Sequence, residues 1–141
     1  MYLIDTNVIS ELRKKNNANT GVQNFFYGAV ERDFPLFISV ITVGELRRGV
    51  SMIRHRGDRQ QANHLEKWLG FILEEYAENI LDFTISEAQV WGQLRVPNHE
   101  NLLDKQIAAT ALTYDLTVVT RNIDDFIGTG VKLFNPFEDE Q

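Results

Sequence analysis

The chain has 141 residues, enough for one domain with a buried core. Hydrophobic residues make up 43% and charged residues 24%, which is ordinary usage for a globular protein and excludes a disordered chain. Because there is no cysteine, disulfides and thiolate metal sites are excluded, and any metal must be bound by oxygen or imidazole. The formal net charge of -6 argues against a protein that coats nucleic acid through its overall charge.

The amino-terminal segment MYLIDTNVIS lacks the basic region and the long apolar region of a secretory signal. No apolar stretch approaches the ~20 residues that a membrane-spanning helix needs. We therefore expect a cytoplasmic protein without a membrane partner.

The first predicted element is a short apolar strand over residues 2–4, which ends directly at Asp5. Apolar residues at positions 8, 9 and 12 then recur at helical spacing, so the pattern predicts a strand, a turn and a helix. Asp5 follows a buried strand, where an unpaired carboxylate is costly. Of the acidic residues considered below, Asp5 is therefore the least easily explained by a purely structural role.

A second buried strand is predicted over residues 36–41. The sequence Thr42-Val43-Gly44-Glu45 follows and matches the capping box of a helix start, which places Glu45 in the first helical turn. After a basic stretch over residues 47–59, apolar residues over 65–76 recur at helical spacing and predict an amphipathic helix. Its apolar stripe is expected to pack in the core or to pair with a partner chain.

The second half of the chain continues the alternation. A short strand is predicted over residues 80–83, and a second capping box, Thr84 to Glu87, starts a helix that ends at Pro97. Asn101 is predicted to cap the next helix, with Asp104 at its third position. A strand over 116–120, a polar loop over 121–126 and a last strand over 131–134 complete the order.

Strands that alternate with helices predict a three-layer α/β domain, with a mainly parallel central sheet flanked by helices. We expect one domain over residues 1–141, with a flexible tail after about residue 137. In such sheets, the carboxyl ends of different strands converge on one crevice, where the strand order reverses. The sequence therefore predicts one pocket that collects Asp5, Glu45, Asp104 and the Asp124/Asp125 pair.

A cluster of carboxylates is the ligand set that Mg²⁺ and Mn²⁺ prefer, and a bound ion can activate water to attack a phosphodiester. Each acid also has a structural interpretation. Glu45 is explained by its capping box and Asp104 by the dipole of its helix, while the Asp124/Asp125 pair suits a turn. Arg47 and Arg48 open the basic stretch and are candidates to contact a nucleic-acid backbone, although a solvated helix face is at least as likely.

Four segments carry a family resemblance: MYLIDTNVISEL, SVITVGELRRGV, LLDKQIAATALTYDLTVVTRNIDDF and KLFNPF. With these motifs in this order, the chain resembles PIN-domain ribonucleases of the VapC toxin family, in the FitB-like subgroup. The resemblance covers most of the chain. It implies a PIN-like fold and an Mg²⁺-dependent endoribonuclease, with Mn²⁺ as the alternative ion. It also implies the toxin of a type II toxin-antitoxin pair, usually a homodimer bound by a VapB-like antitoxin.

Carried over motif by motif, the resemblance implies that the catalytic acids are Asp5, Glu45, Asp104 and Asp125, with Asp5 and Asp104 as metal ligands. Thr6, Asn7 and Asn122 are implied as supporting residues. Some relatives have an acid where this chain has Asn122, whereas others have the acid three residues later, which favours Asp125 over Asp124. We therefore expect one firmly bound metal ion in the absence of substrate.

Two other functions fit parts of the pattern. A non-catalytic PIN-like module would keep the fold and bind only nucleic acid or a partner, but it would have no need of the acids. A phosphatase with an aspartate nucleophile also starts with a strand that runs into Asp. That chemistry needs a second acid two residues later, where this chain has Asn7, and an amide cannot act as a general acid.

Overall fold

The computed structural model describes residues 1–138. Its strands are β1 (Tyr2–Ile4), β2 (Leu36–Ser39), β3 (Ile80–Leu81), β4 (Thr117–Val119) and β5 (Lys132–Phe134). Its α-helices are α1 (Thr6–Glu11), α2 (Thr20–Glu31), α3 (Val40–His55), α4 (Arg59–Glu75), α5 (Ile85–Leu94) and α6 (Leu102–Tyr114). Short 3₁₀ helices are η1 (Leu12–Asn17), η2 (Ala77–Asn79), η3 (Ile123–Phe126) and η4 (Pro136–Glu138).

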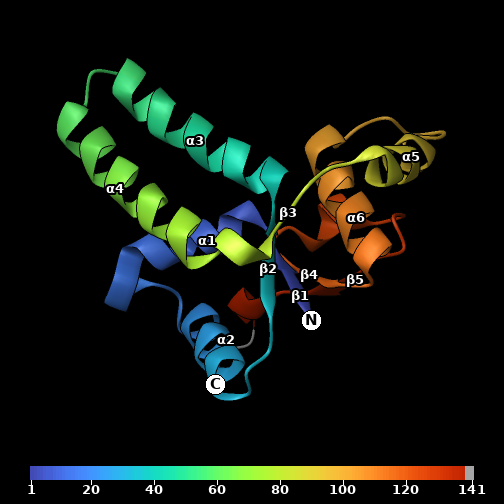
Figure 1. Cartoon of the computed structure of the whole chain (residues 1–141), viewed down its shortest axis with the longest axis horizontal. Coiled ribbons are helices and arrows are strands. Elements are labelled where there is room, and N and C mark those ends of the chain that lie inside the picture. The colour runs from blue at the N-terminus through green and yellow to red at the C-terminus, as the bar shows by residue number, and fades with distance from the viewer. Residues whose placement is uncertain (139–141) are drawn as a thin grey trace.

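The strands form one parallel sheet in the order β3-β2-β1-β4-β5. Helices α1 to α4 lie on one side of it and α5 and α6 on the other, so the molecule has three layers (Figure 1). From β1 the chain first builds outward through β2 and β3, then crosses back to place β4 on the other side of β1. The predicted α/β fold with a parallel sheet is confirmed. The point where the strand order reverses lies between β1 and β4.

Each central strand is buried on both faces because its side chains alternate between two hydrophobic clusters. In β1, Ile4 packs against the α1–α4 layer, while Leu3 packs against α6. In β4, Val119 packs against the α1–α4 layer, while Val118 packs against α6. All four side chains are fully buried, as expected for strands covered on both sides by helices.

The predicted capping box at Thr42 is wrong. Strand β2 ends at Ser39, whose hydroxyl accepts a hydrogen bond from the backbone N–H of Ile41 at 3.0 Å, so α3 begins at Val40. Residues 40 and 41 were predicted as strand because both are apolar and β-branched. Glu45 consequently lies in the second turn of α3. The other predicted capping box is confirmed, because the carboxylate of Glu87 accepts from the backbone N–H of Thr84 at 2.8 Å.

The structure contains two helical features that were not predicted from the sequence. Helix α2 was not predicted, although Asn19 caps it by accepting from the backbone N–H of Val22 at 3.1 Å. The basic stretch forms the second half of α3, which pairs with α4 as a helical hairpin. No helix within residues 1–138 combines the length and the apolar character that crossing a bilayer requires. Of the predicted flexible tail, residues 139–141 lie outside the described residues, and Glu138 ends η4.

Candidate active site

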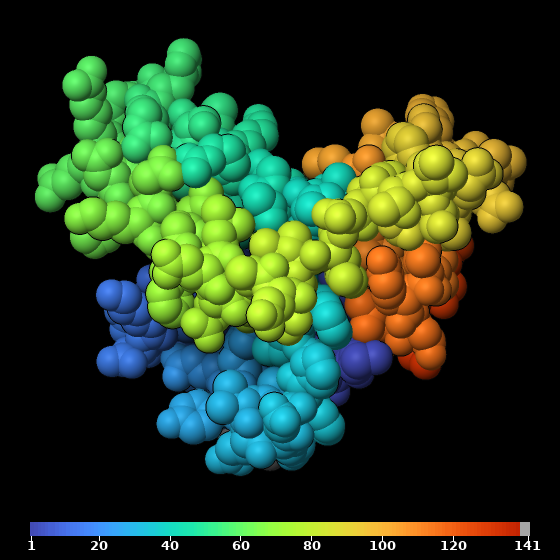
Figure 2. Space-filling model, in the orientation of Figure 1, coloured from blue at the N-terminus to red at the C-terminus, as the bar shows by residue number. Residues whose placement is uncertain are grey.

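The candidate site lies at the reversal point of the strand order. Chain segments that leave β1 and β4 run side by side here, because the backbone N–H of Asp5 donates to the carbonyl of Val119 at 2.9 Å. At this end of the sheet the surface is hollowed between α3 and the α5–α6 pair (Figure 2). The rule for open α/β sheets places ligand sites at this position.

Asp5 is the most buried of the predicted acids, with 3% of its surface exposed. It caps α1, and its Oδ1 accepts from the backbone N–H of Thr6 at 2.8 Å. Its Oδ2 accepts from the hydroxyl of Thr120 at 2.9 Å and from Nδ2 of Asn7 at 3.2 Å. Burial raises the pKa of Asp5 above its ordinary value, these three hydrogen bonds oppose the rise, and the charge of Asp125 adds to it.

Glu45 reaches the same site from α3. Its Oε1 accepts from the hydroxyl of Thr6 at 3.1 Å, and that hydroxyl also lies 3.3 Å from the hydroxyl of the buried Thr42. Burial raises the pKa of Glu45, and the neighbouring charge of Asp5 raises it further, while Thr6 and Arg48 oppose the rise. Glu45 and Asp5 therefore share one electrostatic environment, although 40 positions separate them in the chain.

Asp104 occupies the third position of α6, as predicted, but Asn101 at the N-cap position makes no side-chain capping hydrogen bond. Partial burial raises its pKa to about 7, and the charges of Asp5, Asp125 and Glu45 contribute in that order. Asp125 lies in η3, and its backbone carbonyl accepts a hydrogen bond from Nδ2 of Asn101 at 3.5 Å. The pKa values of Asp5, Glu45 and Asp104 are thus each raised by at least one other acid of the set, which carboxylates scattered over the surface would not do.

Asp125 and Asp124 differ in their surroundings. Asp125 is partly buried and is among the charges that raise the pKa values of Asp5 and Asp104. Asp124 is exposed on the outer side of η3. This arrangement favours Asp125 as the fourth member of the cluster.

Thr120 was not predicted as a site residue, yet it joins the supporting residues into one network. Its hydroxyl accepts from Nδ2 of Asn7 at 3.3 Å and from the backbone N–H of Asn122 at 3.0 Å. Oδ1 of Asn7 in turn accepts from the backbone N–H of Arg121 at 3.0 Å. The available signal was its position: Thr120 directly follows an apolar strand, in the same way as Asp5.

Comparison with known proteins agrees with this geometry. The family model described as PIN domain matches residues 2–131. The chain belongs to the PIN-domain family. It is 37% identical to Toxin FitB of Neisseria gonorrhoeae, over 99% of this chain and 100% of that protein. It is 31% identical to VapC ribonuclease Y4jK of Sinorhizobium fredii, over 98% of this chain and 99% of that protein. The crystal structure of FitAcB from Neisseria gonorrhoeae superposes with a TM-score of 0.84 at 34% identity, over 98% of this chain and 99% of that chain. Within the PIN-domain family, the chain therefore falls among the VapC and FitB toxins.

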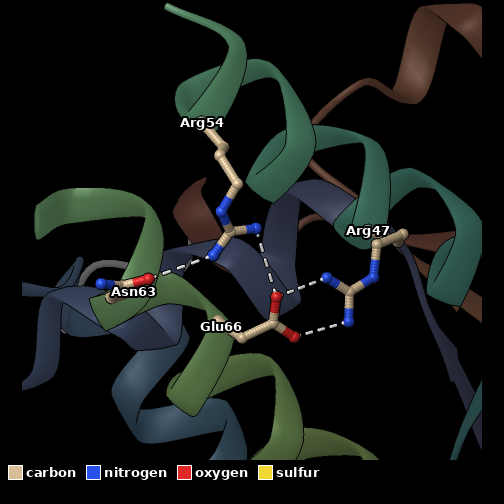
Figure 3. Close-up of polar contacts among 4 residues, drawn as sticks. All are labelled: Arg47, Arg54, Asn63 and Glu66. Atoms are coloured by element: carbon tan, nitrogen blue, oxygen red, sulfur yellow. Dashed lines mark hydrogen bonds and ion pairs between the residues drawn. The ribbon is translucent and has the colours of Figure 1, made fainter. Parts of the chain in front are cut away.

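The basic residues of this PIN domain divide into two groups. The guanidinium of Arg47 forms a bidentate ion pair with Glu66 on α4, with both N–O distances at 2.7 Å, and Arg54 binds the same carboxylate at 3.4 Å (Figure 3). These two arginines hold α3 against α4. Arg48 instead lowers the pKa of Glu45 by its charge and therefore lies on the side of the acidic cluster. Of the two arginines predicted to contact RNA, Arg48 is the better placed.

The donor set of this PIN domain suits a hard divalent cation that keeps much of its water. Within residues 1–138, no three acidic or imidazole side chains come together closely enough to hold an ion by themselves. A closed zinc or calcium cage would need such a group, whereas Mg²⁺ binds through one or two carboxylates and retains several waters. The raised pKa values of Asp5, Glu45 and Asp104 show repulsion and burial that a cation would offset.

We predict that Asp104 makes the metal-free protein less stable as the pH rises. Because its folded pKa is about 7 and its ordinary value is 3.8, the folded state binds the proton more tightly. Stability from this group is therefore full below about pH 4, falls as the pH rises towards 7 and is constant above that. When urea unfolding is measured in chelator between pH 4 and pH 7, the free energy of unfolding should fall more steeply with pH for the parent than for Asp104→Asn.

The matched control is Asp82→Asn, which removes an exposed carboxylate after β3. It should lose stability with the same pH dependence as the parent. If the stability of Asp104→Asn changes with pH as that of the parent does between pH 4 and pH 7, the pKa of Asp104 is not raised in the folded protein.

Proposed function

We propose that this PIN domain is an Mg²⁺-dependent endoribonuclease, which acts in the cytoplasm as the toxin of a type II toxin-antitoxin pair. The observation that carries the proposal is that Asp5, Glu45 and Asp104 gather at the reversal point of the sheet, where burial raises the pKa of each and neighbouring acids, Asp125 among them, raise it further. The similar proteins named Toxin FitB and VapC ribonuclease Y4jK support the biological role and the substrate class. Mn²⁺ is the alternative ion, because it accepts the same oxygen ligands.

Each acid has a distinct part in the proposed reaction. Asp5 and Asp104 would hold the ion, which when bound supplies a Lewis acid for the scissile phosphate and a more acidic water. Glu45 is fixed through Oε1 by the hydroxyl of Thr6, so its other oxygen is free to accept the proton of the attacking water. Asp125 adds negative charge that draws the cation to the pocket. No side-chain nucleophile is required.

RNA binding at the site depends on local rather than overall charge. The chain carries a net charge of -6, so a polyanion is repelled except where cations gather. Arg48 acts on Glu45 from α3, which places a positive charge beside the acids. We propose that Arg48 binds a backbone phosphate next to the scissile bond.

Cleavage of structured RNA tests the proposed activity. With Mg²⁺ or Mn²⁺ the parent should cut, and excess chelator should abolish cutting. Asp5→Asn keeps an N-cap residue at α1 but removes a ligand charge, so it should fold while losing roughly a hundredfold or more in rate, since several kcal/mol of charge stabilisation are lost. Asp125→Asn should also slow cleavage, whereas Asp124→Asn, the same change at the exposed neighbour, should not.

Equal cutting by the parent and Asp5→Asn would remove Asp5 from the mechanism. Circular dichroism and thermal unfolding establish that each variant is folded. Absence of cutting by a folded parent with either ion, combined with retained RNA binding, would instead identify a non-catalytic binding module.

A groove between η1 and α4 is the surface that we assign to the antitoxin. It has a volume of about 1050 Å³, and its apolar lining includes Leu12, Leu65, Trp68 and Phe71, of which Phe71 is 59% exposed. Four cations lie along the same groove: Arg13, Lys14, Lys15 and Lys67. An apolar segment flanked by acidic residues complements this surface.

The groove refines the prediction for the amphipathic stretch over residues 65–76. Leu69 of this stretch is buried in the core and does not line the groove, and Ile72 lines the groove although only 2% of its surface is exposed. On α2, Phe25 and Phe26 pack against the same core, and Tyr27 is exposed. A homodimer, which the resemblance to VapC toxins implies, stays a prediction.

Phe71→Glu tests the groove, because it places a negative charge among apolar and basic groups at an exposed position. This variant should bind a VapB-like antitoxin at least roughly 30-fold more weakly than the parent, the effect of losing a contact of about 2 kcal/mol. Val30→Glu is the matched control, since Val30 is 79% exposed on α2 and does not line the groove. Unchanged affinity in Phe71→Glu, or equal loss in both variants, would contradict this assignment.

A further inference from the structure

Thr120 is the only hydroxyl within residues 1–138 that donates a hydrogen bond to Asp5. It follows the last residue of β4, and its side chain is fully buried beside the carboxylate that caps α1. The other contacts of this hydroxyl determine which group receives its single proton.

A threonine hydroxyl has one proton to donate and two lone pairs to accept with. Nδ2 of Asn7 donates to it at 3.3 Å, and the backbone N–H of Asn122 donates to it at 3.0 Å. Neither donor can accept in return, so both lone pairs are used. The proton is therefore directed to Oδ2 of Asp5, at a distance of 2.9 Å.

Asn7 cannot reverse this arrangement. Its Oδ1 accepts from the backbone N–H of Arg121 at 3.0 Å, so the amide must present Nδ2 to Asp5 and Thr120. The orientation of the hydroxyl is thus set by backbone groups of the segment that follows β4. It does not depend on a mobile side chain.

The same contacts determine which part of Asp5 faces a ligand. An ionised carboxylate offers about four lone-pair sites. Oδ2 receives hydrogen bonds from Thr120 and Asn7, and Oδ1 receives one from the backbone N–H of Thr6. One site remains on Oδ1, so the carboxylate is held with a single defined direction open.

We propose that Thr120 is a positioning residue, which fixes the carboxylate of Asp5 so that its remaining Oδ1 lone pair is presented to the divalent cation. This inference rests on the proposed function, in which Asp5 is a ligand of that cation. Hydrogen-bonding partners of ligating carboxylates typically contribute about 10–100-fold to metal affinity. Loss of the Thr120 hydroxyl should therefore be visible in binding of the ion, without any measurement of cleavage.

A purely structural role is the alternative, because the same hydroxyl also links the segment after β4 to the start of α1. The two roles differ in what loss of the hydroxyl changes. A structural role lowers the stability of the metal-free protein and leaves the Mn²⁺ affinity of the folded protein unchanged. A positioning role lowers that Mn²⁺ affinity, because it depends on the donated proton, which serine retains and valine lacks.

Mn²⁺ binding to the full chain, measured by electron paramagnetic resonance of the free ion, tests the inference. Thr120→Val should weaken Mn²⁺ binding by roughly 10–100-fold, while Thr120→Ser should stay within about threefold of the parent. Thr110→Val is the matched control. Thr110 is equally buried, and its hydroxyl donates to the carbonyl of Gln106 within α6, at 3.3 Å, so its loss should leave affinity unchanged. Urea unfolding in chelator establishes that each variant is folded.

If Thr120→Val does not fold, Thr120→Cys replaces it, because a thiol is a weaker donor, and the same direction of change is expected. Parent-like Mn²⁺ affinity in the folded valine or cysteine variant would overturn the inference, and so would an equal loss in Thr120→Ser. A folded parent that binds no Mn²⁺ contradicts the proposed function itself, and that outcome is recognised before any variant is compared.

Discussion

The burial and mutual repulsion of clustered carboxylates, of which Asp5 is buried and Glu45, Asp104 and Asp125 are half-buried, is the constraint on which the rest of this structure depends. Asp5, Glu45, Asp104 and Asp125 come from four separate segments, and the pKa of each of the first three is raised by burial and by at least one of the others. Such a cluster opposes folding unless hydrogen bonds or a cation offset it. The fold supplies the hydrogen bonds, through the helix start at Thr6 and the hydroxyls of Thr6 and Thr120.

The buried core around the sheet supplies the stability that offsets this concentration of charge. Its central strands are buried on both faces, with Leu3 and Val118 against α6 and Ile4 and Val119 against the α1–α4 layer. Burying two hydrophobic faces against one short sheet gives a rigid base, from which the segments after β1 and β4 project in fixed directions. The proposed site therefore lies where the strands end, and the buried core lies along their length.

Sequence reasoning succeeded where a local pattern and a topological rule coincide. Asp5 follows an apolar strand and Asp104 stands at the third position of a helix that begins after Asn101, and both positions agree with the prediction. It failed at Glu45, because β-branched residues at the start of α3 look like strand and the serine that caps the helix lies three positions before the apparent box. Thr120 was missed because its importance comes from partners at positions 5, 7 and 122, which no local pattern brings together. The pairing of Arg47 with Glu66 depends on how α3 packs on α4, which is likewise not local.

The central claim is that side chains from distant segments share one divalent ion. Anomalous scattering from crystals soaked in Mn²⁺ measures this directly. The account predicts one strong peak within coordination distance of a carboxyl oxygen of Asp5 and of a carboxyl oxygen of Asp104. A peak bound to only one of these residues, or no peak between them at saturating Mn²⁺, would contradict it.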